Sequence, residues 1–357
     1  MNKRIFLGLV LAGLTGTGCS ETTEAEPVHE AKSVIAGKLG AHAAQEALDE
    51  DTIAVQAYER VRQAHAARQA QSVRLAVYSL QPVDDVVAQV DARARTVGLE
   101  MGAARKSGHE LMVEAGHRVL SIDARSGTER YVDRSRFHSG RSVATLPLAR
   151  ADYIARAREH VQRALPEVAT RNMRAYKFRQ YVNESAGPNG ERTGPQVYQV
   201  AVAFQEMVGD LPVIGSGGKV AVHLTPNGEI IAHESAARGV GRRLADLSGS
   251  EVLDPEVARR QAEERLAARG VRLENYRLVR AELGYLRHGR HSPQSVMAPH
   301  YAYLYEPLSP AVGGRKVVEV VPAVTNPEVL AQLRQDAQAE AQRKAERMAY
   351  AQPEDVR

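Results

Sequence analysis

The sequence predicts an α+β protein made of repeated units, each a helix packed on a small antiparallel sheet, with further helices near both ends. Between residues 193 and 238, apolar and polar residues alternate and Gly/Pro turns interrupt the pattern, which is typical of half-buried strands. Two segments have helical periodicity and start or stop signals, 148–165 and 254–270. Each of these predicted helices precedes a group of predicted strands. The apolar content of 43% and charged content of 25% are those of a folded soluble chain.

Residues 1–19 are predicted to be a lipoprotein signal peptide. A basic start precedes an apolar run at 5–14, which is too short to span a bilayer as a mature helix. Cys19, the single cysteine of the chain, follows small residues and resembles the lipidation site of bacterial lipoproteins, although Gly16 stands where that motif usually has Leu. Ser20 in place of Asp resembles the signal for outer-membrane sorting. The alternative is an ordinary cleaved signal with an incidental cysteine.

Residues 20–72 are predicted to form a short acidic tether and an Ala-rich helical region. The first α+β unit is expected at 73–140. A strand at 73–80 is followed by a helix that begins at Pro82, and then by a meander of short strands with a turn at 123–127.

The second unit is expected at 145–245. It begins with the helix at 148–165, which Pro166 ends, and continues with strands at 176–182 and 197–208. The segment Gly209–Pro212 interrupts the second of these strands, because proline has no N–H to donate to a ladder.

A hairpin completes this unit, with strands at 219–224 and 229–234. Pro226 has no N–H for a two-residue Asn-Gly loop, so a type I turn with Gly228 in the left-handed region is expected. In that register His223 and His233 share the less buried face, where they are either a metal or peptide contact or two solvated polar residues. The core face is predicted to hold Val220, Val222, Leu224, Ile230 and Ala232.

The stretch from Thr193 to Arg238 resembles the propeptide modules of secreted thermolysin-like metallopeptidases, of the FTP and PepSY type. Four segments carry the resemblance: Val200–Phe204, Gly209–Gly215, Val220–Val222 and Asn227–Ile230. The resemblance implies cystatin-like α+β units that bind, and either inhibit or assist, a peptidase. No peptidase domain follows in this chain, which is a departure from that family.

The third unit is expected at 250–324 and a C-terminal helix at 326–350. Asp254 and Pro255 form a helix start, with an Asp cap and proline at the first helical position. Strands are predicted at 276–286, 300–307 and 316–324. One strand face carries three tyrosines, which either pack across strands beneath the helix or form a ligand platform: Tyr301, Tyr303 and Tyr305.

A long basic loop is predicted between the first two of these strands. Arg287 and Arg290 lie in or beside it and would repel a cation. The loop is either a solvated connection or a contact for an acidic partner.

Catalytic signatures are missing from the sequence. His29, His109 and His233 are each followed by Glu, but none has a second His at the spacing of a zinc-peptidase helix. No G-x-S-x-G motif exists, and the cysteine is assigned to the lipid. The sequence therefore predicts no enzyme activity, cofactor or metal.

Charge argues against a nucleic-acid partner. The chain has 47 basic and 43 acidic residues, and without Lys3 and Arg4 of the signal the excess of positive charge is two. The predicted function is that of a non-catalytic lipoprotein, anchored in the outer membrane by its N-terminal lipid, which binds an exported protein partner such as a peptidase. The alternative is a structural or sensory envelope lipoprotein without a peptidase partner.

Overall fold

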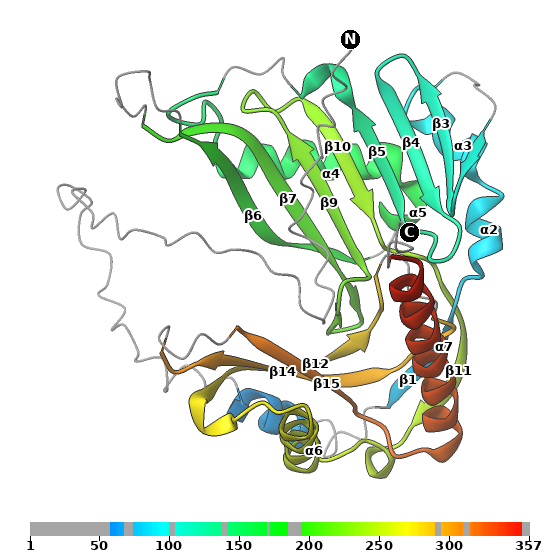
Figure 1. Cartoon of the computed structure of the whole chain (residues 1–357), viewed down its shortest axis with the longest axis vertical. Coiled ribbons are helices and arrows are strands. Elements are labelled where there is room, and N and C mark those ends of the chain that lie inside the picture. Colours follow the sequence, from blue (N-terminus) through cyan, green and yellow to red (C-terminus); the bar gives the residue numbers. More distant parts are fainter. Residues whose placement is uncertain are drawn as a thin grey trace, which may run out of the picture.

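One large sheet dominates the computed structural model, which describes residues 58–67, 74–99, 104–137, 142–169, 172–184, 194–289, 294–309 and 315–351. The sheet has twelve strands, and a second sheet has three. Strands make up 42% of the structure. The prediction of repeated units, each with its own small sheet, was wrong, because strands from all three predicted units join into one large sheet (Figure 1).

Two pairings produce this continuity. Strand β10 (Ile230–Ser235) pairs with β5 (Glu129–Asp133), which joins the first two predicted units. Strand β8 (Leu211–Ile214) pairs in parallel with the end of β12 (Tyr276–Leu286), which joins the second and third. If the strands formed separate small sheets, their backbone N–H and C=O groups at the sheet edges would have no partners. Each of the two pairings satisfies such groups.

The remaining strands extend the two sheets. From one end, the large sheet runs β15-β14-β12-β8-β7-β9-β10-β5-β4-β3-β2, and β6 pairs with β7 outside this path. The small sheet has the order β11-β1-β13. The bounds not yet given are β1 Leu75–Leu80, β2 Arg105–Ser107, β3 Glu110–Ala115, β4 Arg118–Asp123, β6 Met173–Asn183, β7 Gln196–Val208, β9 Lys219–Leu224, β11 Val240–Leu247, β13 Val296–Met297, β14 Pro299–Pro307 and β15 Val317–Pro322.

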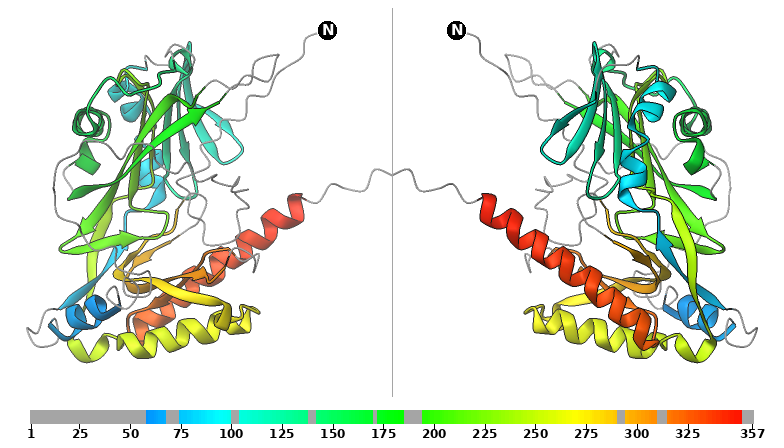
Figure 2. Two further views of the ribbon diagram at one scale, coloured as in Figure 1. Left: turned by 90° about the vertical axis from the view of Figure 1, so that its left-hand side faces the viewer. Right: turned by 90° about the vertical axis from the view of Figure 1, so that its right-hand side faces the viewer.

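The large sheet bends into two parts. Strands β6 to β3 form the upper part in Figure 1, and β12, β14 and β15 form the lower part. Helices α4 (Arg150–Ala164) and α5 (Pro166–Ala169) lie behind the upper part, whereas α6 (Pro255–Ala268) lies below the lower part. The short helices α2 (Val83–Val87) and α3 (Val90–Thr96) lie beside β3. Helix α7 (Pro327–Ala351) begins at the lower part and projects away from the body of the molecule (Figure 2).

Three cores hold the helices on the sheet. Tyr153, Ala157 and Val161 of α4 pack on the apolar face of β7 and β9, where Val202 and Val222 are fully buried. Each such side chain contributes ~1.5–3 kcal/mol through its burial. Helix α6 packs in the same way on β12 and β14, and α3 packs on β3 and β4. The apolar faces of these three helices therefore select where each one docks.

The predicted start of α6 is confirmed. The Asp254 carboxylate accepts hydrogen bonds from the backbone N–H of Glu256 at 2.8 Å and of Val257 at 3.4 Å, and Pro255 is the first helical residue. These bonds satisfy N–H groups that have no partner inside the helix.

The turn between β9 and β10 has the predicted left-handed glycine and a turn hydrogen bond. The N–H of Gly228 donates to the Thr225 carbonyl at 2.9 Å, and Gly228 has a φ of 84°. The predicted register beyond the turn was wrong, because a β-bulge lies between Ile230 and Ala232. One extra residue moves every later side chain of β10 to the opposite face.

The bulge separates the two histidines. His233 lies opposite Val222 on the face that α4 covers, whereas His223 lies opposite Ala232 on the other face. Both rings are buried, with exposed fractions of 0% for His233 and 2% for His223. The expectation of a shared, less buried histidine face was therefore wrong.

Candidate functional site

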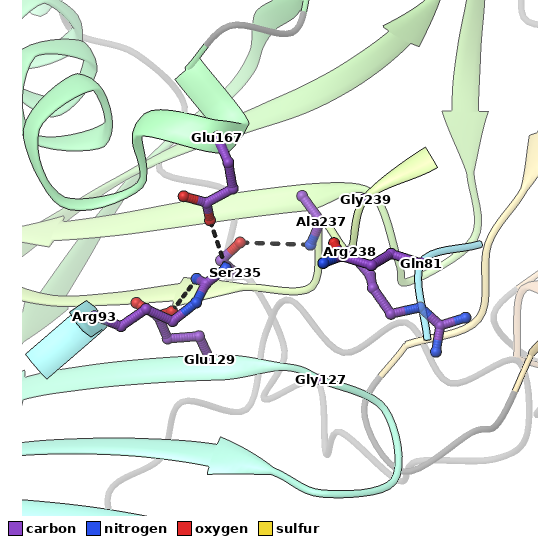
Figure 3. Close-up of a pocket in the computed structure, with 9 residues that line it drawn as sticks. All are labelled: Gln81, Arg93, Gly127, Glu129, Glu167, Ser235, Ala237, Arg238 and Gly239. Atoms are coloured by element: carbon purple, nitrogen blue, oxygen red, sulfur yellow. Dashed lines mark hydrogen bonds and ion pairs between the residues drawn. The ribbon is translucent and has the colours of Figure 1, made fainter. Parts of the chain in front are cut away.

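A buried polar cluster lies between β5, β10, α3 and α4, and we call it the Glu129 cluster: Arg93, Glu129, His160 and His233. The Glu129 carboxylate forms an ion pair with Arg93 and a 3.0 Å hydrogen bond with Nε2 of His233. Nδ1 of His233 lies 2.8 Å from Nε2 of His160. Arg93 also pairs with Glu167 at 2.7 Å, as Figure 3 shows.

Burial sets the protonation of the Glu129 cluster. Burial, His233 and Arg163 lower the pKa of His160 to about 3, so its ring is neutral at pH 7. Burial would raise the pKa of Glu129, but the hydrogen bond and charge of His233 and the charge of Arg93 outweigh it and lower that pKa. His233 donates from Nε2 to the Glu129 carboxylate, and a hydrogen bond joins its Nδ1 to Nε2 of the neutral His160.

Little space remains beside the Glu129 cluster. The cavity in Figure 3 has a volume of ≈ 10 Å³, which is room for about one water molecule. Among the described parts of the chain, no group of three or more His, Cys, Asp and Glu side chains is arranged to hold a metal ion. The cluster links α3 and α4 to the sheet, and the cavity beside it has no room for a substrate. The residues that line the cavity are Gln81, Arg93, Gly127, Glu129, Glu167, Ser235, Ala237, Arg238 and Gly239.

Of the Glu129 cluster, only His233 was among the candidate residues predicted from the sequence. One signal in the sequence was usable. Glu129 lies two residues before Tyr131 in β5, so the two side chains share a strand face, and this face belongs to the core. Tyr131 stacks on the ring of His233, with centroids 5.5 Å apart. Nothing local to α4 indicates that His160 would meet these groups.

His223 occupies the opposite sheet face, among residues of β6 and β7. Its Nδ1 contacts the side-chain amide of Gln199, and the Tyr181 ring lies 6.1 Å away. Burial and the charge of Arg130 lower the pKa of His223 to about 4, so the ring is neutral and Nε2 carries the hydrogen. This Nε2 is buried without a hydrogen-bond partner among the described residues.

The three tyrosines predicted to share a strand face are buried between β14 and α6. The Tyr301 hydroxyl donates to the Leu253 carbonyl at 3.0 Å, and the Tyr303 hydroxyl donates to the Pro255 carbonyl at 2.9 Å. The Tyr305 hydroxyl donates to the Glu263 carboxylate at 3.3 Å. This placement is the packing alternative, and it leaves no open ring face for a ligand.

Arg287 is not in an exposed loop, although it was a candidate contact for a partner. Its side chain is 2% exposed, forms an ion pair with the buried Glu206 of β7, and donates to the Met297 sulfur at 3.2 Å. Gly217 packs over it so closely that a Cβ would lie 2.2 Å from the His288 carbonyl. Two other candidates, Cys19 and Arg290, lie outside the described residues.

Strand β6 presents a long open edge. Among the described strands it pairs with β7 alone, and it extends over 11 residues. The other two edge strands of the large sheet are shorter, with 6 residues in β15 and 3 in β2. A long open edge offers backbone N–H and C=O groups to another extended chain.

A groove runs beside this edge, and we call it the β6 groove. Its volume is ≈ 510 Å³, within the range of ligand and peptide sites. The Arg150 guanidinium lies 5.4 Å from the centre of the Phe178 ring and forms part of its wall. The lining residues are Ala144, Thr145, Leu146, Leu148, Arg150, Phe178 and Gln180.

Comparisons with known proteins identify no family. No family model matches the chain, and no curated protein matches it. A solved structure of an uncharacterized protein from Eubacterium rectale is similar to 71% of this chain and 85% of its own, with 9% sequence identity and a TM-score of 0.40. Within the described residues, no helix is both long enough and apolar enough to cross a membrane.

Proposed function

We propose that this protein is a non-catalytic, lipid-anchored protein of the cell envelope that binds an exported protein partner along the open edge of β6. The observation that carries the proposal is the 11-residue edge strand with an adjoining groove of ≈ 510 Å³. An extended segment added to β6 gains backbone hydrogen bonds, and a groove beside it accepts side chains. The role without catalysis rests on the sequence, which has neither a zinc-peptidase H-E-x-x-H motif nor a G-x-S-x-G motif.

The resemblance of residues 193–238 to metallopeptidase propeptides favours an exported peptidase as the partner. Binding would then either inhibit or assist that peptidase. A structural or sensory role without a peptidase remains the alternative, and the identity of the captured partner decides between them.

Photo-crosslinking tests the binding edge. Val182 of β6 and Val318 of β15 are both exposed valines on edge strands, with exposed fractions of 53% and 49%. A benzoylphenylalanine at position 182 should crosslink a protein partner in intact cells, and the same group at 318 should not. Mass spectrometry of the adduct identifies the partner. Crosslinks at 318 alone, or at neither position, would refute binding at β6.

Substitution of the lipid site tests the anchor. Cys19→Ala should move the protein from the detergent phase to the aqueous phase of a membrane extract, or leave it unprocessed. The reason is that two or three acyl chains hold a protein firmly, at ~0.8 kcal/mol per buried methylene. Full partitioning of the substituted protein into detergent would show that its anchor is elsewhere.

A further inference from the structure

The two faces of β6 carry different chemistry because of a β-bulge. Lys177 lies opposite Ala203 of β7 and Arg179 lies opposite Ala201, so both are on the face away from α4. A register shift between Ala175 and Lys177 places Arg174, opposite Gln205, on this face as well. Without the bulge, Arg174 would point to the face that α4 covers, because side chains alternate along a strand.

These three cations have no acidic partner in the described parts of the chain. No ion pair joins Arg174, Lys177 or Arg179 to a carboxylate, and β6 itself contains no Asp or Glu. Elsewhere on the large sheet exposed cations do have partners; for example, Arg105 pairs with Glu114 and Arg280 with Glu282. Charged residues on an open edge discourage pairing with another copy of the same strand, since like charges would then face each other.

On the opposite face β6 carries no charged side chain, and the groove there is lined by both apolar and polar groups. Phe178 lies opposite Val202 and belongs, with Leu146 and Leu148, to the wall of the β6 groove. A strand added to β6 would therefore present one set of alternate side chains to the cations and the other set to the groove.

We propose that the segment which β6 binds is an extended chain of alternating acidic and apolar residues, with its carboxylates facing Arg174, Lys177 and Arg179 and a bulky apolar side chain in the β6 groove. This inference rests on the proposed function and specifies its ligand. The charge pattern gives the interaction its selectivity and its dependence on salt, and the groove fixes the register of the added strand.

Fluorescence polarisation with labelled peptides tests the inference. The probe is an eight-residue peptide of alternating valine and glutamate with one central leucine. One control peptide carries glutamine in place of glutamate, and a second has the probe's composition with acidic and apolar residues in separate blocks. The probe should bind at low ionic strength, and each control peptide should bind about tenfold more weakly.

Variants of the protein supply the matched controls. Lys177→Glu with Arg179→Glu should weaken probe binding about tenfold or more, whereas Arg105→Glu with Lys106→Glu on edge strand β2 should leave it unchanged. Ala144→Trp, at an exposed position of the groove wall, should weaken binding of the leucine probe but not of a probe with alanine in its place. Circular dichroism confirms that each variant is folded.

The outcomes separate this inference from the proposed function. If position 182 crosslinks a partner in cells but the glutamine or block peptide binds as well as the probe, the acidic, alternating ligand is refuted and binding at β6 stands. If no peptide binds while the partner is captured at 182, the inference is again refuted. If position 182 captures nothing in cells, the proposed function fails whatever the peptides do.

Discussion

His160 should make the protein sensitive to mild acid, and His160→Gln should reduce that sensitivity. The His160 ring is 6% exposed, and its pKa is lowered from 6.5 to about 3 by burial, by His233 and by Arg163. Between these two pH values the unfolded chain binds a proton at His160 and the folded chain does not. The free energy of unfolding therefore falls as the pH falls through this window, and it is unaffected by this group above about pH 6.5.

The magnitude follows from the size of the shift. One proton taken up on unfolding costs ~1.4 kcal/mol of stability per pH unit. Between pH 6 and pH 4.5 the wild-type protein should then lose ~2 kcal/mol more than His160→Gln, which has no titrating ring. At neutral pH the variant should be less stable by ~1 kcal/mol, because its amide replaces the hydrogen bond to His233 imperfectly.

Urea unfolding at a series of pH values measures both quantities. His117→Gln, at an exposed histidine, is the matched control and should leave the pH dependence unchanged. Equal pH dependence of the wild type and His160→Gln would refute the reasoning, since it would mean that folding does not shift the protonation of His160.

Three further substitutions test the packing of the sheet by thermal or urea unfolding. Gly228→Val should destabilise by ~1–3 kcal/mol, because Gly228 has a φ of 84°, and an unchanged melting temperature would contradict this. Arg287→Met should cost ~3–5 kcal/mol, because it removes the Arg287 cation that pairs with the buried Glu206 carboxylate. Adding Glu206→Gln should restore most of this stability, and no recovery would argue against the ion pair. His223→Ala should cost ~1–3 kcal/mol, because the ring is 2% exposed and contacts Gln199. This cost is larger than the less buried position predicted from the sequence implied. A variant with unchanged stability would show that the ring is solvated.

Local signals in the sequence predicted individual elements well. The strand expected at 276–286 is β12, and the alternation at 197–208 lies within β7. The Asp254–Pro255 helix start and the left-handed Gly228 were also confirmed, because each depends on only a few neighbouring residues.

The assembly of these elements could not be read from the same signals. The pairing of β8 with β12 and of β10 with β5 depends on which edges meet, and an edge has no local signature. A single inserted residue in β10 moved His233 into the core, and periodicity alone does not locate a bulge. The Glu129 cluster was missed because its members come from elements far apart in the chain.

The position of β1 has a consequence for the order in which the chain folds. This strand, Leu75–Leu80, is mostly buried and pairs with β11 and β13, which follow much later in the chain. At the rate of synthesis in cells, β11 is made about 8 to 30 s after β1, and β13 is made later still. During that interval this apolar strand has none of its strand partners, so it is exposed to aggregation in the nascent chain. Residues 75–80 therefore stay without a strand partner until β11 has emerged, although they lie near the start of the described fold.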